Sequence, residues 1–388
     1  MPNKILFCAT VDYHFKAFHL PVLEWFKQQG WEVHIAAKGE LDLPFVDRKF
    51  NLPIERSPIH TNNIKAYREL KAIMNEQQYQ IIHCHTPTGG VLARLAAQGA
   101  RKKGTKVIYT AHGFHFCKGG SLVNWMLYYP IEKYFARLTD CLITINNEDH
   151  QLAVSRRFQA GQIVHTHGVG VNTVRYKPMS KIDKWRLRQE LDYRTDDFLM
   201  FYAAEFNNNK NHQLLIHALA SIKEEVPHAR LMLAGKGGLL EACRALAEQL
   251  GVGNMVHFLG YRTDIDRLLP MCDVAVASSL REGLPVNIME AMACGLPIVA
   301  SRNRGHSELV IDGVNGFVLE GHQIQAFGQR LLELSRSKTL REEFGGNSGA
   351  MVKKYSLAHV ALELHEIYKP LMGQPQAEQE EKLQWVVL

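Results

Sequence analysis

The chain has 388 residues, of which 46% are hydrophobic and 22% charged, a balance typical of a folded protein with material for two hydrophobic cores and not of a disordered chain. It contains no run near the ~20 consecutive apolar residues of a membrane-spanning helix, and its early apolar run, residues 5–9, is too short for a secretory signal. The net charge of +6 is uneven, because the first 176 residues carry 21 Lys and Arg against 13 Asp and Glu. Either an anionic partner or an ordinary solvated surface would account for that excess.

The seven cysteines are scattered along the chain and form no C-x-x-C pair. Several lie in strand-like runs, among them Cys8, Cys84 and Cys141. An odd number of dispersed thiols in apolar surroundings favours a reduced, cytoplasmic protein over a disulfide framework.

The first half of the chain alternates short apolar runs with amphipathic ones. The predicted strands are residues 4–10, 31–37, 81–86, 106–112, 141–146 and 162–167. The predicted helices between them include residues 64–77, 90–103 and 122–136. Strands this apolar, separated by helices, indicate a parallel sheet covered on both faces.

The pattern restarts after residues 168–178, where Gly and Pro predict a hinge. The second series of predicted strands is residues 198–205, 229–235, 255–260, 274–279 and 297–301, with helices at 211–225 and 239–250. The fold class is therefore α/β, with two Rossmann-like, doubly wound domains.

We place the N-terminal domain at residues 1–176 and the C-terminal domain at residues 177–355. A helix at 356–372 carries an apolar stripe and is expected to pack back on the N-terminal domain. Residues 373–388 read as a tail, whose apolar end would dock either on the body or on a partner.

One segment of the second half has the composition of a phosphate site. Pro285 suits the first turn of a helix that begins after a parallel strand, and Gly283 lets the backbone approach a ligand closely. The start of such a helix offers free N–H groups and a positive dipole end. Glu282 and Glu290 would accept hydrogen bonds from sugar hydroxyls, or they are a helix-start carboxylate and a solvated helix residue.

Residues 278–300 resemble the E-x7-E signature of family 4 retaining glycosyltransferases, with Glu282 and Glu290 as the two glutamates. The likeness extends over nearly the whole chain, through residues 83–86, 110–113, 235–237, 258–262 and 312–317. Residues 110–116 and 208–212 are similar to the bacterial capsule, exopolysaccharide and lipopolysaccharide branch. The resemblance implies the GT-B fold, in which two Rossmann-like domains face each other across a cleft. It places the nucleotide sugar in the C-terminal domain and the acceptor mainly in the N-terminal one.

The resemblance also implies roles for individual residues. Glu282 would bind the donor sugar, Lys210 would neutralise the diphosphate leaving group, and His112 would stabilise the transition state. Glu290 would bind the ribose. The remaining donor-binding candidates are Gly283, Leu284, Pro285, Val286 and Asn287 at the helix start, Gly235, Gly237, Tyr261 and Arg262 near the base, and Glu205.

Two positions depart from the family pattern. Where the family has Gly-Arg before its lysine, this chain has Ala204 and Glu205, so either Arg262 or Arg281 substitutes for the missing cation or Glu205 has a polar, structural role. The turn after the first strand has no glycine. Its candidates for acceptor contact are Asp12, Tyr13 and His14, assisted by His115, although Asp12 would equally serve as a helix cap.

No metal is expected, since the family does not need one and no carboxylate pair ends a strand. The H-x-H pairs His83/His85 and His165/His167 each share one strand face, without an obvious third ligand. Basic residues 101–106, Lys118 and Lys133 accompany the apolar run 122–129, which is either a membrane-facing surface or a core helix.

The sequence thus predicts retaining transfer of a sugar from a nucleotide diphosphate, preferably UDP, to a polyprenyl-diphosphate-linked glycan precursor. The nucleotide sugar is a co-substrate and no cofactor is required. Alternatives are a sugar-nucleotide epimerase, a phosphorylase, or a non-enzymatic glycan- or nucleotide-binding protein. Nucleic acid is not an expected partner, because the chain lacks an array of aromatic and basic residues.

Overall fold

The computed structural model describes residues 2–372, and these divide into two compact units. Unit 1 comprises residues 2–170 together with 358–372, and unit 2 comprises residues 171–357. The division falls inside the segment 168–178 that was predicted as a hinge, six residues before the predicted boundary. The predicted tail, residues 373–388, lies outside the described residues.

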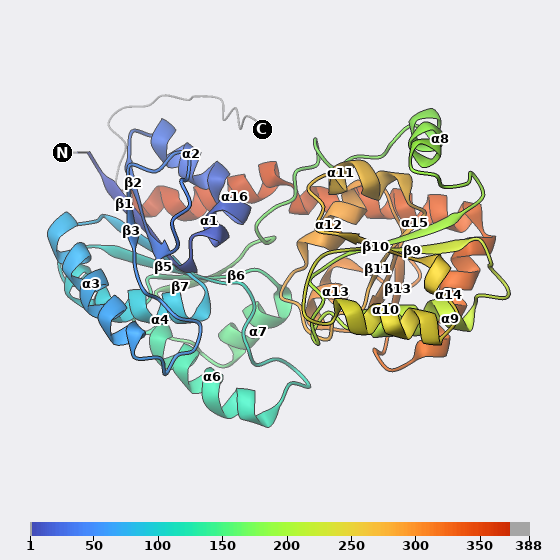
Figure 1. Cartoon of the computed structure of the whole chain (residues 1–388). Coiled ribbons are helices and arrows are strands. Elements are labelled where there is room, and N and C mark those ends of the chain that lie inside the picture. The colour runs from blue at the N-terminus through green and yellow to red at the C-terminus, as the bar shows by residue number, and fades with distance from the viewer. Residues whose placement is uncertain (1, 373–388) are drawn as a thin grey trace. The chain divides into compact units, whose positions relative to one another are not determined.

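Unit 1 is built on a seven-stranded, fully parallel sheet with the order β3-β2-β1-β4-β5-β6-β7. Its strands are β1 Lys4–Val11, β2 Glu32–Lys38, β3 Arg48–Asn51, β4 Ile81–His85, β5 Lys106–Ala111, β6 Cys141–Thr144 and β7 Gln162–His165. Its helices are α1 Tyr13–Phe18, α2 Leu20–Gln28, α3 Asn62–Gln77, α4 Pro87–Ala96, α5 Gln98–Arg101, α6 Leu122–Ala136 and α7 Asn147–Ser155, with α16 Leu357–Tyr368 added from the end of the chain (Figure 1).

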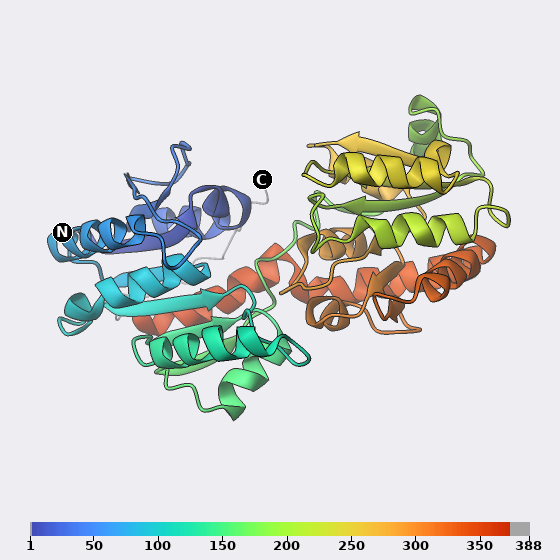
Figure 2. The ribbon, with the colours of Figure 1, turned by 60° about the horizontal axis from the view of Figure 1, so that its bottom comes forward.

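Helices cover both faces of this sheet (Figure 2). Successive side chains of a strand point to opposite faces, so β1 contributes to two cores. Leu6 and Cys8 join the core beneath α3 and α4, whereas Ile5 and Phe7 join the core beneath α1, α2 and α16. This alternation explains why β1 reads as a continuous apolar run, as a strand buried on both sides requires.

Unit 2 repeats the arrangement with a six-stranded parallel sheet of order β10-β9-β8-β11-β12-β13. Its strands are β8 Phe198–Ala203, β9 Ala229–Ala234, β10 Val256–Gly260, β11 Val274–Ala277, β12 Ile298–Ser301 and β13 Gly316–Leu319. Its helices are α8 Lys181–Glu190, α9 His212–Ser221, α10 Leu240–Gln249, α11 Ile265–Leu268, α12 Val286–Ala293, α13 Arg304–Leu309, α14 Ile324–Arg336 and α15 Lys338–Met351.

The strand orders confirm the predicted fold class. Both sheets run outward in opposite directions from a central pair, β1 and β4 in unit 1 and β8 and β11 in unit 2. This is the Rossmann order, and ligands of such sheets bind outside the carboxyl ends of the strands where the direction reverses. We refer to these two places as the switch points of unit 1 and unit 2.

The sequence-based prediction missed two strands, both at a sheet edge. The four residues of β3 (Arg48–Asn51) are half-buried or exposed and include two cations, so they lack an apolar run. The four residues of β13 (Gly316–Leu319) begin at a glycine whose added Cβ would lie 2.0 Å from the carbonyl oxygen of Ile298. Composition did not reveal β3 because it lacks apolar residues, whereas β13 is apolar and mostly buried but only four residues long.

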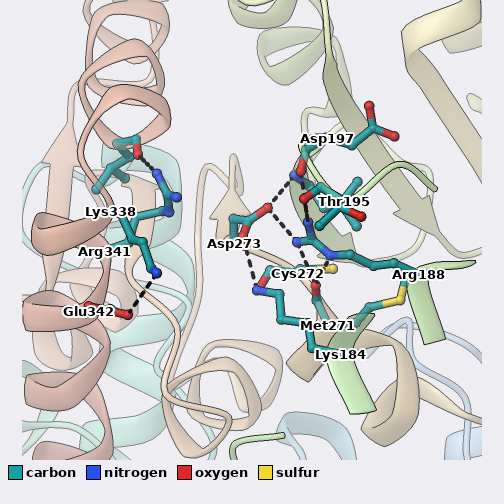
Figure 3. Close-up of polar contacts among 12 residues, drawn as sticks. Lys184, Arg188, Thr195, Asp197, Met271, Cys272, Asp273, Lys338, Arg341 and Glu342 are labelled. Atoms are coloured by element: carbon teal, nitrogen blue, oxygen red, sulfur yellow. Dashed lines mark hydrogen bonds and ion pairs between the residues drawn. The ribbon is translucent and has the colours of Figure 1, made fainter. Parts of the chain in front are cut away.

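The amino ends of the unit 2 strands carry a buried ionic cluster, shown in Figure 3. Asp273, just before β11, accepts hydrogen bonds from Arg188 at 2.7 Å and from Lys184 at 3.1 Å. Arg188 also donates to the carbonyl oxygen of Met271. Burial alone would raise the pKa of Asp273, but Lys184 and Arg188 lower it. The cluster fastens α8 to the sheet, at the end opposite the switch point.

Candidate active site

The unit 2 switch point is formed by two loops that hydrogen bonds hold together. One follows β8 and contains Lys210, and the other follows β11. Ser278 Oγ donates to the carbonyl oxygen of Lys210 at 2.7 Å, and the Leu280 N–H donates to that of Asn209 at 2.8 Å. The Asn209 side chain donates in turn to the carbonyl oxygen of Arg281 at 3.0 Å. The loop that carries Lys210 is therefore fixed against the loop that leads to Glu282.

Lys210 and Glu282 form an ion pair at this point, between Nζ and Oε1. Their side chains are only 23% and 15% exposed, so the pair is shielded from solvent more than a surface salt bridge. The structure thus brings together the two residues that were predicted separately as the leaving-group cation and the sugar-binding carboxylate.

Helix α12 begins a few residues after Glu282. Pro285, predicted to lie in the first turn, is its N-cap, and Val286 is its first residue. No side chain caps this end, so the first N–H groups of the helix have no partner within the helix. The Asn287 side chain donates to the carbonyl oxygen of Ala203 at 3.0 Å and holds the helix start against the end of β8. The result is a site suited to an anion.

Glu290 is not the solvated helix residue of the alternative interpretation, because it is largely buried on α12. Burial raises the pKa of Glu290 to about 7, although a hydrogen bond with Tyr176 and the charge of Arg175 act in the opposite direction. Such a carboxyl group changes its charge near neutral pH. Its ability to accept hydrogen bonds from a ligand's hydroxyls therefore depends on pH.

Arg304 is a member of this site that the sequence analysis did not identify. It is the first residue of α13, and its Nε donates to the carbonyl oxygen of Glu282 at 3.1 Å. The next residue, Gly305, packs so tightly here that an added Cβ would lie 2.9 Å from both Glu282 and Pro285. Arg304 thus places a second cation beside the loop that carries the Lys210–Glu282 pair.

The unit 1 switch point has a different composition. His85 ends β4, His112 follows β5, and His14 and His19 belong to the segment after β1. His85 Nδ1 lies 3.2 Å from His112 Nε2, and His14 Nε2 lies 3.0 Å from His19 Nε2. Burial lowers the pKa of all four imidazoles, that of His14 to about 4. The predicted residues His112 and His14 therefore lie together, in a neutral cluster.

Comparison with known proteins agrees with this arrangement. Residues 183–350 match the family described as "Glycosyl transferases group 1", and residues 4–146 match "Glycosyl transferase 4-like". The chain is 50% identical over 372 residues to the Bacillus subtilis (strain 168) protein designated glycosyltransferase EpsD, which covers 96% of this chain and 98% of that protein. The chain is a family 4 glycosyltransferase of the GT-B type.

One further relative and one solved structure are similar to this chain over most of its length. The chain is 27% identical over 294 residues to an Escherichia coli "UDP-Gal:alpha-D-GlcNAc-diphosphoundecaprenol alpha-1,3-galactosyltransferase", covering 73% of this chain and 75% of that one. Among solved structures, Anabaena HepE in complex with UDP and glucose superposes with a TM-score of 0.76 at 21% identity, over 95% of this chain and 100% of that one. Membership of a glycosyltransferase family favours sugar transfer over the epimerase and binding-protein alternatives.

In this glycosyltransferase, Ala204 and Glu205 occupy the place of the family's Gly-Arg. Glu205 is exposed, and its carboxylate accepts a hydrogen bond from the Asn207 side chain at 3.1 Å. Arg262, one suggested substitute, is engaged by both carboxylate oxygens of Asp264. Arg281, the other, has an exposed side chain. By contrast, Arg304 contacts the Glu282 loop directly, which makes it the better-placed cation.

The residues predicted near the base lie at the end of β9 and β10. Gly235 and Gly237 adopt φ angles of 154° and 151°, and a Cβ on Gly235 would lie 2.0 Å from the carbonyl oxygen of Ala204. Only glycine therefore allows this loop to lie against the end of β8. Tyr261 is 64% exposed, so its ring is available for stacking.

The predicted acceptor residues occupy unequal environments. The Asp12 carboxylate is buried, where it accepts hydrogen bonds from the Leu41 N–H at 2.8 Å and from Lys49 at 2.7 Å, and it makes no side-chain cap to α1. Tyr13 is 58% exposed. His115 is exposed, with its ring centroid 4.7 Å from that of Tyr128.

Each of the two H-x-H pairs has polar neighbours, hydroxyls in one case and a carboxylate in the other, that the sequence did not reveal. His83 and His85 share a face of β4, with ring centroids 4.1 Å apart. His83 contacts the hydroxyls of Tyr368 and Thr110. His167 lies 2.6 Å from Glu363 on α16, and His359 is near the same carboxylate. In each case the additional residues come from a distant part of the sequence.

Proposed function

We propose that the chain transfers a sugar, with retention, from a UDP-sugar to a hydroxyl of a polyprenyl-diphosphate-linked glycan precursor in bacterial surface polysaccharide synthesis. The proposal rests chiefly on the pairing of Lys210 with Glu282 at the start of α12. The printed name of the Escherichia coli relative, which specifies a UDP donor and a diphosphoundecaprenol acceptor, supports the choice of substrates.

The geometry suits departure of a diphosphate. As the bond between the anomeric carbon and the donor phosphate breaks, negative charge grows on the phosphate oxygen. Lys210 and Arg304 both contact Glu282, and the start of α12 follows it, so positive groups would lie near the place where that charge develops. The acceptor hydroxyl attacks from the same face, and its proton passes to the departing phosphate, so no protein nucleophile is needed.

Glu282 and Glu290 would bind the neutral part of the donor. In this proposal Glu282, in the loop before α12, accepts hydrogen bonds from the sugar hydroxyls and orients Lys210, while Glu290 on α12 accepts from the ribose. His112 of unit 1 would contact the donor sugar in the transition state, as the resemblance implies.

The test is a panel of UDP-sugars incubated with polyprenyl-diphosphate-linked acceptors, followed by mass spectrometry of the products. We expect one donor to yield a lengthened lipid-linked glycan, and Glu282→Ala to abolish it. Glu320→Ala is the matched control, because Glu320 is exposed in the same unit and pairs with Arg302. Full activity of Glu282→Ala would refute the role assigned to Glu282. If no UDP-sugar yields a product, the assignment of UDP as the donor nucleotide is wrong.

We also propose that unit 1 contacts the cytoplasmic leaflet through α6, where a lipid-linked acceptor would be found. Leu122, Val123 and Met126 of this helix are 79%, 63% and 72% exposed. Trp125 and Tyr129 pack against the core, so α6 both exposes and buries apolar side chains, and each of the two alternative interpretations applies to a part of the helix.

Cations near α6 would add attraction to anionic lipids. Lys118, Arg137 and residues 102–103 are exposed close to it in the chain. Among the described residues no helix has both the length and the apolar character to cross a bilayer. Binding at the surface is therefore what α6 offers.

Co-sedimentation with vesicles that contain phosphatidylglycerol measures this contact. We expect Met126→Glu to reduce the bound fraction severalfold. Ile182→Glu is the control, since Ile182 is 67% exposed on α8 of unit 2. Equal binding of the two variants, or absence of binding by the unmodified chain at low salt, would contradict the proposed surface.

A further inference from the structure

The four histidines at the unit 1 switch point have more in common than their place in the fold. One ring nitrogen each of His14, His19, His85 and His112 lies within 4.8 Å of the other three. His19 and His85 are 7% and 0% exposed, and the other two are half-buried. The rings come from three segments of the chain, which only the fold brings together.

The spacing fits a single tetrahedral ion. A zinc ion bound at about 2.0–2.1 Å places neighbouring ligand nitrogens about 3.3 Å apart. The two closest nitrogen pairs here are separated by 3.0 and 3.2 Å. Ring centroids of the six pairs are 4.2–5.8 Å apart, so the four rings converge on a common centre instead of stacking in one layer.

Two contacts among the imidazoles are close enough for an N–H···N bond, His14 with His19 and His85 with His112. An ion at the common centre would replace both contacts, because each of these four nitrogens would then direct its lone pair at the metal. His85 would bind through Nδ1, which leaves its buried Nε2 as the ring N–H.

The protonation state is the one that a metal requires. Burial lowers the pKa of His19, His85 and His112 well below the ordinary value, so the rings are neutral at pH 7 and offer lone pairs. No carboxylate belongs to the cluster. Asp12, the nearest acidic residue in the chain, is occupied by Lys49.

We infer that His14, His19, His85 and His112 form a binding site for one zinc ion. Imidazole nitrogen is the donor that Zn²⁺ and its neighbours in the first transition row prefer, whereas Mg²⁺ and Ca²⁺ take oxygen ligands. Four ligands fill a tetrahedral zinc shell, so the ion is structural and binds no substrate.

The site would fasten the segment that contains α1 to the ends of β4 and β5. These are the parts of unit 1 from which His112 and the predicted acceptor residues project. A metal-bound imidazole keeps its other ring N–H as a donor, so zinc binding is compatible with contact between His112 and a sugar. No metal was expected from the sequence, since the family does not need one and no carboxylate pair ends a strand; the proposed ligands come from three separate segments.

Metal analysis of the full chain tests this site without any donor or acceptor, and so independently of the proposed transfer reaction. The protein is purified without a polyhistidine tag, dialysed, and analysed by inductively coupled plasma mass spectrometry. We expect about one zinc per chain in the unmodified protein and less than about a tenth in His19→Asn. His359→Asn, in the separate cluster with His167 and Glu363, should retain the metal.

A second measurement covers the case in which His19→Asn fails to fold. Metal-free, unmodified protein is titrated with Co²⁺ and then with Zn²⁺. We expect the visible absorption of tetrahedral cobalt at one equivalent, its loss on addition of one equivalent of zinc, and no response to Mg²⁺. A protein that takes up no cobalt and no zinc overturns the inference. Zinc that is lost from His359→Asn and kept by His19→Asn also overturns it.

Discussion

The two switch points have the same strand order but opposite chemistry. Unit 2 places an ion pair, a second cation and an uncapped helix start at the ends of β8 and β11. Unit 1 places neutral imidazoles at the ends of β1, β4 and β5. Topology therefore determines where a ligand binds, while a few loop residues determine which ligand, and a charged diphosphate suits only unit 2.

The largest expected effect comes from removing the unit 2 cation. Lys210→Ala should lower kcat about 10²–10³-fold, because one preorganised charge at the developing oxyanion is lost. Steady-state transfer rates measure it, with Lys338→Ala as the control, since the Lys338 side chain is 69% exposed. If Lys210→Ala lowers kcat by less than tenfold, the charge of Lys210 is not what distinguishes the unit 2 switch point from that of unit 1.

The next effect is on stability, and it concerns the ionic cluster at the amino ends of the unit 2 strands, opposite the switch point. Asp273→Asn should lower the free energy of unfolding by about 3 kcal/mol, because it leaves Arg188 buried without its partner charge. Urea denaturation at pH 7 measures the loss. Asp196→Asn is the control, because Asp196 is 61% exposed in its pair with Arg194.

The loss of stability in Asp273→Asn should depend on pH, because the pKa of Asp273 is lowered in the folded chain. A carboxyl group whose pKa is lower in the folded state stabilises the fold above its unfolded pKa. That contribution is lost as the pH falls through the folded value. The difference between the unmodified chain and Asp273→Asn should therefore shrink below about pH 4. A difference that is constant down to pH 2 would contradict the ionic account.

Arg304 provides a smaller and more selective test. Arg304→Ala should lower kcat roughly 10–100-fold, because the second cation beside the Glu282 loop is removed. Arg262→Ala should have little effect, since Arg262 is engaged by Asp264. Arg304→Lys should recover part of the rate by restoring the charge. If Arg262→Ala is the more damaging change, the assignment of the cation is wrong.

The smallest effect is a change of pH profile. A ribose hydroxyl that donates to Glu290 favours the ionised carboxylate, so donor binding should tighten as the pH rises through the pKa of about 7. Isothermal titration with UDP, which carries the same ribose as any UDP-sugar, should give up to about tenfold tighter binding at pH 8 than at pH 6. Glu290→Gln should flatten this profile, and Glu320→Gln should not. If the unmodified chain and Glu290→Gln show the same pH dependence of binding, Glu290 does not bind the ribose.

The sequence predicted the fold because both sheets are central, parallel and buried, so their strands read as apolar runs. It did not predict β3 or β13, which are four-residue edge strands. It grouped Glu282 and Glu290 through the E-x7-E spacing, although only Glu290 lies on α12 and Glu282 lies in the loop before it. It missed Arg304 and the histidine cluster, because residues 85, 112 and 304 are positioned by crossovers that no local pattern encodes. A cation just before a glycine, after a predicted strand, was the available signal for Arg304.

The return of α16 to unit 1 has a consequence for synthesis on the ribosome. Tyr368 stacks on Trp25 and contacts His83, yet it is separated from them by the whole of unit 2. Translation therefore completes the contiguous unit 2, residues 171–357, before unit 1 receives its last helix. Until then the nascent chain exposes the apolar side chains of β1 and α2 that α16 covers. The domain that begins first finishes last, and during elongation it is the part most exposed to aggregation and chaperone binding.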